Sequence, residues 1–278
     1  MAAALERFSS QDVLLLMSHG TRDPDGVSEL QQLAQTIQNV AGRWRVEIGV
    51  LEFPDPALPS IADVIDRCAA EGVDRVAAVP LLLHQAGHSK QDMPQVLADA
   101  LHRHPGVQFS SCPSLGVHPS LFEVLEERAG EPVRGRDPIA PCDTTLLLVA
   151  RGSSDAEANA DFFRVARLVW ERGQYGNVEC CFVSLTGPAV ADGIDRCVRL
   201  GARRVLVVPY FLSTGILVKR IGTQAQEACA RDSGVEILVG RHLGIHPKIV
   251  DLILERADVV RGRLSPATDN RELAPAGT

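Results

Sequence analysis

The sequence repeats itself, and this duplication limits the folds that the chain can adopt. Three short motifs occur twice, in the same order and at a nearly constant offset: Ile-Asp-Arg-Cys at 65–68 and 194–197, Leu-Gly-Val/Ile-His-Pro at 115–119 and 243–247, and Glu-Arg-Ala at 127–129 and 255–257. Solenoid repeats have periods of only about 20–50 residues. A period this long therefore indicates two duplicated domains.

Each copy alternates short apolar strands with helices. In the first copy we expect strands at 12–17, 45–51, 75–80 and 107–111, and helices at 26–40, 59–70, 89–102 and 118–129. In the second copy we expect strands at 144–149, 178–183, 203–209 and 235–239, with helices between them and a last helix at 246–257. Such alternation predicts parallel sheets covered by helices. The expected fold class is α/β, with two duplicated domains that each hold a parallel four-stranded sheet with helices on both faces.

The boundaries of the two domains follow from composition. Residues 131–143 are rich in Pro, Gly and charge, as is typical of a linker. We therefore expect an N-terminal domain at 1–130 and a C-terminal domain at 144–262. The polar tail at 263–278 is predicted to be disordered.

Composition and charge exclude several kinds of partner. The chain is 45% hydrophobic and has no apolar run near the roughly 18 residues of a membrane span, and its seven cysteines lack CxxC spacing. A net charge of -7 argues against nucleic acid and anionic membranes as partners. We expect a cytoplasmic protein, in which any polyanionic substrate would need a local basic patch.

The two copies can be compared with each other, because residues that both copies share most simply serve the fold. His118 and His246 each precede a proline at an expected helix start, so we predict that they cap these helices or pack there. Cys68 and Cys197 are predicted to be small buried residues on the second helix of each copy.

Three polar residues that follow strands occur only in the first copy: His19, Glu52 and His88. Their counterparts in the second copy are Arg151, Ser184 and Leu217. Ligands of open parallel sheets bind at the carboxyl ends of the strands. Two imidazoles and one carboxylate suit a divalent ion such as cobalt, iron or nickel. We therefore predict a metal site in the N-terminal domain.

His84 lies near the same edge, opposite Ser213 in the second copy. This histidine could be a fourth metal ligand, a proton acceptor or merely an exposed residue, and the sequence leaves all three roles open.

Several motifs together carry a resemblance to a known family: Ser-His-Gly-Thr-Arg-Asp at 18–23, Leu-Glu-Phe at 51–53, Gly-His-Ser-Lys-Gln-Asp-Met-Pro at 87–94, Arg-Gly-Ser-Ser-Asp at 151–155 and Ala-Asn-Ala-Asp at 158–161. In their order and spacing the chain resembles the two-domain form of the sirohydrochlorin chelatase family, of the CbiX or SirB type, over about residues 12–260. The resemblance implies a chelatase-like, flavodoxin-like fold similar to that of class II ferrochelatases. Carried over, the family's metal-binding histidines fall on His19 and His88, and its acidic partner falls on Glu52.

The resemblance also implies the reaction, which is insertion of cobalt or ferrous iron into sirohydrochlorin on the way to cobalamin or siroheme. The divalent metal, with nickel as a further candidate, is then a substrate, and no organic cofactor is expected. Neutral His or ionised Glu accepts the two pyrrolic protons. We expect a monomer whose repeat imitates a dimer, with this small tetrapyrrole as partner and no nucleic acid or membrane.

Sirohydrochlorin has eight carboxylates, and cations around a cleft between the copies are expected to hold them. We expect Arg151, Arg22, His84 and Lys90 to bind the substrate, and Lys219 and Arg220 are further candidates. Arg151 has a second possible role, in which it is buried and forms a structural ion pair with Asp155 or Asp161.

Two other functions remain open. Histidine phosphatases also carry His-Gly after a first strand, but they place Arg where Ser18 stands, and they leave Glu52 and His88 without a role. A metal or tetrapyrrole carrier would bind the same ligands without turnover.

Overall fold

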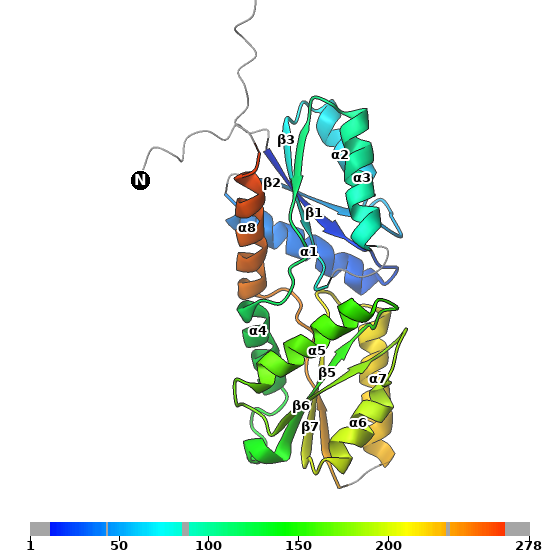
Figure 1. Cartoon of the computed structure of the whole chain (residues 1–278), viewed down its shortest axis with the longest axis vertical. Coiled ribbons are helices and arrows are strands. Elements are labelled where there is room, and N and C mark those ends of the chain that lie inside the picture. The colour runs from blue at the N-terminus through cyan, green and yellow to red at the C-terminus, as the bar shows by residue number, and fades with distance from the viewer. Residues whose placement is uncertain (1–11, 43, 85–88, 232–233, 265–278) are drawn as a thin grey trace, which may run out of the picture.

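Two α/β halves are stacked along the long axis of the molecule (Figure 1). The computed structural model describes residues 12–42, 44–84, 89–231 and 234–264. The strands are β1 (Asp12–Ser18), β2 (Arg45–Val50), β3 (Arg75–Pro80), β4 (Gln108–Ser111), β5 (Thr144–Ala150), β6 (Asn177–Phe182), β7 (Arg204–Pro209) and β8 (Glu236–Val239). The helices are α1 (Pro24–Val40), α2 (Ile61–Ala70), α3 (Ser89–Arg103), α4 (Pro119–Gly130), α5 (Ala156–Trp170), α6 (Val190–Arg199), α7 (Ile216–Arg231) and α8 (Pro247–Arg261), with a 3-10 turn η1 (Pro141–Asp143).

Both sheets have four parallel strands and the same order, β2-β1-β3-β4 and β6-β5-β7-β8. The predicted fold class is therefore confirmed. The chain moves from β1 outward to β2 and then back across β1 to β3, so the strand order reverses beside β1. In open parallel sheets the crevice at such a reversal is the usual ligand site.

Helices cover both faces of the first sheet. Successive side chains of a strand point to opposite faces. Leu14 and Leu16 of β1 accordingly join the core under α1, whereas Leu15 joins the core under α2 and α3. Cys68 on α2 and its counterpart Cys197 on α6 are buried in the matching outer cores, as predicted.

The last helix of each copy packs on the sheet of the other copy. Helix α8 lies against β3 and β4 of the first sheet, and α4 lies against β7 and α5 of the second half. Figure 1 shows α8, the last helix of the chain, beside the sheet formed by the first strands. The predicted limits at 1–130 and 144–262 follow the repeat in the sequence, whereas the packing exchanges one helix between the halves. One continuous core consequently joins both halves through α4 and α8.

Paired, nearly symmetric hydrogen bonds join each exchanged helix to the segment that precedes the other one. The Arg128 guanidinium on α4 donates to the carbonyl of Leu243 at 2.7 and 3.1 Å. Its counterpart Arg256 on α8 donates to the carbonyl of Leu115 at 3.4 Å. This reciprocity is typical of an interface with two-fold symmetry, and the duplicated chain forms it within one molecule.

The predicted capping role of the shared histidines is confirmed. Nδ1 of His118 accepts the backbone N–H of Ser120 at 3.3 Å, and Nδ1 of His246 accepts that of Lys248 at 3.2 Å. The other ring nitrogen of His246 lies 2.9 Å from a carboxylate oxygen of Glu127 on α4. These two histidines thus serve the helix starts and the α4–α8 contact.

Candidate active site

The carboxyl ends of β1 and β2 bring His19 and Glu52 together. Beyond the regular strands the two segments continue to pair, since the Glu52 amide donates to the His19 carbonyl at 2.8 Å. The Nε2 atom of His19 lies 3.6 Å from Oε1 of Glu52. This separation is too long for a hydrogen bond. The side chains are 33% and 47% exposed, so both donors are open to an incoming ion.

A glycine permits this close pairing of the two strand ends. Gly20 has φ +99°, and a Cβ atom there would lie 1.9 Å from the carbonyl oxygen of Glu52. No other residue fits such an approach, because real Cβ atoms do not come so near to backbone atoms. Gly20 thereby fixes how His19 stands beside Glu52.

The second half repeats this backbone with other side chains. The Ser184 amide donates to the Arg151 carbonyl at 3.1 Å, as Glu52 does to His19. Gly152 has φ +87°, and a Cβ there would lie 2.4 Å from the Ser184 carbonyl oxygen. The backbone therefore requires neither imidazole nor carboxylate.

The third predicted ligand cannot be placed, because His88 lies outside the described residues. Lys90 lies in the first turn of α3, but its side chain also falls outside the description. Within the described ranges, no group of three His, Cys, Asp or Glu side chains is arranged to hold a metal ion. His19 and Glu52 are the part of the predicted site that the structure brings together.

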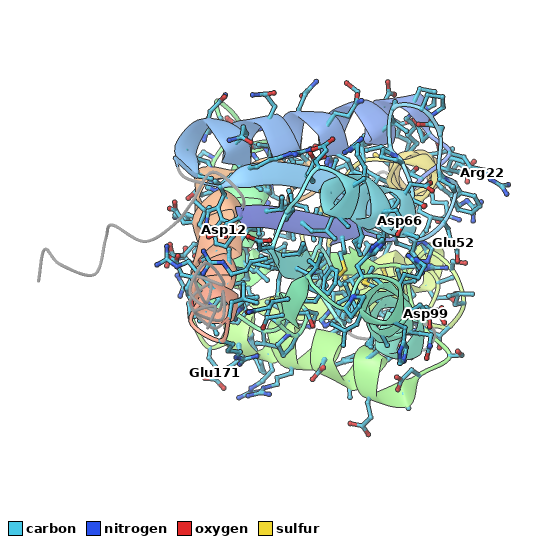
Figure 2. The ribbon with its side chains drawn as sticks, turned by 90° about the horizontal axis from the view of Figure 1, so that it is seen from above. Asp12, Arg22, Glu52, Asp66, Asp99 and Glu171 are labelled. Atoms are coloured by element: carbon cyan, nitrogen blue, oxygen red, sulfur yellow. The ribbon has the colours of Figure 1, made fainter. Side chains whose placement is uncertain are left out.

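Arg22 lies beside this pair. Figure 2 shows Arg22 and Glu52 on the same side of the molecule, opposite Asp12 at the start of β1. The Arg22 guanidinium carbon lies 4.2 Å from the centre of the Phe53 ring. Both residues line a hollow of about 470 Å³ together with Thr21, Pro24, Val27, Pro54 and Asp55. The exposed Arg22 side chain is placed to meet an anionic ligand at this hollow.

The side chain of Arg151 is exposed and forms no ion pair with another described residue. The buried pairing with Asp155 or Asp161 that the sequence left open is therefore wrong. Asp155 instead caps α5, accepting the amide of Glu157 at 3.0 Å. The guanidinium of Arg151 stays available at the strand end that corresponds to His19.

His84 is partly buried against the second half, and both of its ring nitrogens are shielded from solvent, so the role of a merely exposed residue is wrong. Its ring centre lies 5.4 Å from that of Tyr210 and 6.2 Å from that of Phe162, both from the second half. Among the described residues neither ring nitrogen of His84 nor the Tyr210 hydroxyl has a hydrogen-bond partner. Burial lowers the pKa of His84 to about 4, so its ring is neutral near pH 7.

Sequence reasoning missed the aromatic partners of His84. Tyr210 follows Pro209 as Leu81 follows Pro80, and the ring centre of Phe162 lies 5.5 Å from that of Tyr210, so the three rings pack against one another. The signal was available, because an aromatic residue replaces an aliphatic one between copies of a chain with only 4% aromatics. These rings carry the contact between the halves beside the expected substrate region.

Polar contacts also join the two halves; we call this contact region, which includes His84 and Tyr210, the seam. Lys219 on α7 lies 2.8 Å from carboxylate oxygens of both Asp23 and Asp25, so this candidate cation is already paired. Glu29 on α1 accepts the Thr214 amide and lies 2.9 Å from Nε2 of His242. Burial alone would raise the pKa of Glu29, but these hydrogen bonds outweigh it and lower the pKa. The carboxyl edges of the two sheets are thus held facing each other.

The comparisons with known proteins assign the family. The CbiX family model matches twice, at residues 13–132 and at residues 145–260. The chain belongs to the CbiX family. Both the intact first copy and the altered second copy fall within the match, and the resemblance found in the sequence is confirmed.

Two curated relatives and one solved structure are similar over most of the chain. A sirohydrochlorin cobaltochelatase of Priestia megaterium is 34% identical over 245 residues, which cover 88% of this chain and 78% of that protein. A sirohydrochlorin ferrochelatase of the same organism is 28% identical, covering 87% of this chain and 88% of that protein. The structure of SirB from Bacillus subtilis with Fe3+ matches with a TM-score of 0.76 at 25% identity, covering 90% of this chain and 95% of that chain.

The part of the chain that the structure describes contains no helix long and apolar enough to cross a membrane. The family match gives no support to the histidine phosphatase alternative.

Proposed function

We infer that this CbiX protein is a sirohydrochlorin chelatase, which inserts a divalent metal ion, cobalt or ferrous iron, into the tetrapyrrole. The observation that carries this proposal is the His19–Glu52 pair, 3.6 Å apart at the carboxyl edge of one half and replaced at the same backbone position in the other. The names of the similar chelatases support the substrate class.

The metal substrate binds to side chains of the first half. An ion about 2.1 Å from each donor bridges nitrogen and oxygen atoms that are 3.6 Å apart. His88 is our proposed third ligand. Three protein ligands leave coordination positions open for water and then for the ring nitrogens, as transfer of the ion requires.

Insertion releases two protons from the pyrrolic nitrogens as the metal–nitrogen bonds form. The carboxylate of Glu52 and the neutral imidazole of His19 lie where the ion is exchanged, and each accepts a proton once it no longer binds the metal. His19 must be neutral to bind the ion, so activity falls at acid pH through competition between protons and metal.

Basic residues on both halves hold the carboxylates of the tetrapyrrole. Arg22 stands beside the hollow of the first half, and Arg151 and Arg220 are exposed on the second. We propose that Arg22 and Arg151 make bidentate contacts to carboxylates, and that Lys90 contributes from the start of α3. His84 is neutral, so we assign it to packing at the edge of the substrate region and not to charge pairing.

The decisive test is insertion followed by absorbance. Metal-free sirohydrochlorin is incubated with the protein and with Co²⁺, Fe²⁺ or Ni²⁺ in turn, and loss of the free-base spectrum is compared with the rate without protein. We expect catalysed loss with at least one ion and almost none with His19→Ala or His88→Ala. Binding of the tetrapyrrole without catalysed insertion by any ion would identify a carrier and overturn the proposal.

A further inference from the structure

Two large apolar residues stand at a backbone conformation that the chain otherwise gives to glycine. Phe53 has φ +57° and Leu185 has φ +59°. The left-handed region is unfavourable for a residue with a Cβ atom, because the Cβ crowds the backbone carbonyl oxygen. Among the described residues the other ten with positive φ are all glycines. The same turn therefore keeps a strained, bulky residue in both halves where glycine would relieve the strain.

These residues occupy equivalent places next to the proposed site. Phe53 directly follows Glu52, and Leu185 directly follows Ser184, the counterpart of Glu52. The preceding residues are fixed by the same hydrogen bonds to β1 and β5. Each of the two residues consequently lies just beyond the carboxyl edge of its own sheet.

Both side chains are open to solvent to a degree that core packing does not explain. Phe53 is 39% exposed and Leu185 is 64% exposed. Phe53 lines the hollow beside Arg22, whose guanidinium lies over its ring. Strain at a functional position persists when the side chain serves a ligand, and an exposed apolar residue that is kept despite strain needs such a reason.

We propose that Phe53 and Leu185 are the apolar contacts for the faces of the tetrapyrrole ring, one from each half. This inference rests on the proposed function. The macrocycle has flat apolar faces and a rim of carboxylates, so it needs apolar contacts above its faces and cations around its edge. A phenyl ring stacks on such a face, and Arg22, already beside Phe53, reaches the rim. The two turns thus position the ring, while His19 and Glu52 hold the ion.

The glycine variants separate this role from a role in folding. Leu185→Gly relieves the backbone strain and removes a mostly exposed side chain, so its melting temperature should equal or exceed that of the unchanged protein. The dissociation constant for metal-free sirohydrochlorin, measured by fluorescence titration without metal, should rise severalfold. Phe53→Gly should raise it about tenfold, as expected for loss of an aromatic stack and its buried area. Leu200→Ala, at the end of α6, removes another exposed leucine (61%) and should leave binding unchanged.

Metal binding gives the second measurement. Co²⁺ titration without tetrapyrrole should be the same for both glycine variants and the unchanged protein. Unaltered tetrapyrrole affinity in both variants, or a lowered melting temperature in Leu185→Gly, would overturn the inference while insertion by the unchanged protein still upheld the proposed function. If the unchanged protein bound no sirohydrochlorin, both proposals would fall together.

Discussion

The two strand-end turns of this protein have the same backbone and different chemistry. In the first half the turn presents His19 and Glu52, and in the second it presents Arg151 and Ser184. The amide-to-carbonyl hydrogen bonds between the paired residues differ by only 0.3 Å, from 2.8 to 3.1 Å. The backbone therefore sets the place of a side chain but not its identity. In the function proposed above, one half binds the ion while the other binds the tetrapyrrole.

The largest effect is expected when the first half is given the two strand-end residues of the second half. We expect His19→Arg with Glu52→Ser to fold normally, because the second half folds with these residues. Insertion should fall by about a hundredfold or more, since both donors are lost and an added guanidinium repels the ion. Steady-state insertion kinetics measure the loss, and thermal unfolding should stay within about 3 °C.

The reciprocal change is the matched control. Arg151→His with Ser184→Glu should restore no activity in that background, because Leu217 stands where the first half has His88. Near-normal insertion by the first double variant would show that His19 and Glu52 are not ligands.

The role of the second half is tested at Arg151. Loss of a charged hydrogen bond costs about 1.5–3 kcal/mol, so Arg151→Ala should raise the Michaelis constant for sirohydrochlorin roughly ten- to a hundredfold. Arg151→Lys should recover only part of this if the contact is bidentate. Metal affinity, measured by equilibrium titration, should change little. Loss of metal binding in a folded Arg151→Ala protein would contradict the division of roles between the halves.

The smallest expected effect concerns the seam between the halves. Burial holds the pKa of His84 at about 4, against about 6.5 in an unfolded chain. Between these values the unfolded state binds more protons, so this contribution to stability is complete above about pH 6.5 and is lost as the pH falls towards 4. The loss between pH 7.5 and pH 5 is about 2 kcal/mol.

Replacement of His84 by phenylalanine removes the titrating group and keeps a ring beside Tyr210 and Phe162. His84→Phe should therefore flatten the decline of the melting temperature between pH 7.5 and pH 5. The exposed His102 on α3 provides the control, because His102→Ala should retain the decline. An unchanged acid slope in His84→Phe would show that His84 is not the group responsible.

The helices and strands, their order and the proximity of His19 to Glu52 could be predicted from the amino-acid sequence. Seven-residue strands such as β1 and β5 are buried along their whole length, and such continuous apolar runs identify parallel strands from sequence alone. The pairing of His19 with Glu52 also follows from sequence, because neighbouring parallel strands end at the same edge. Comparison of the copies correctly predicted that His118 and His246 cap helices.

Which surfaces pack against each other is visible only in the folded molecule. Helices α4 and α8 have equivalent apolar faces. The hydrophobic periodicity of a helix predicts that one face is buried, but it does not indicate which sheet covers that face. The exchange of these helices and the burial of His84 against Tyr210 were therefore not predictable. The positive φ of Phe53 and Leu185 was equally hidden, because a sequence signals the left-handed region mainly through glycine. At these two positions the packing of each turn imposes a conformation that the residue itself disfavours.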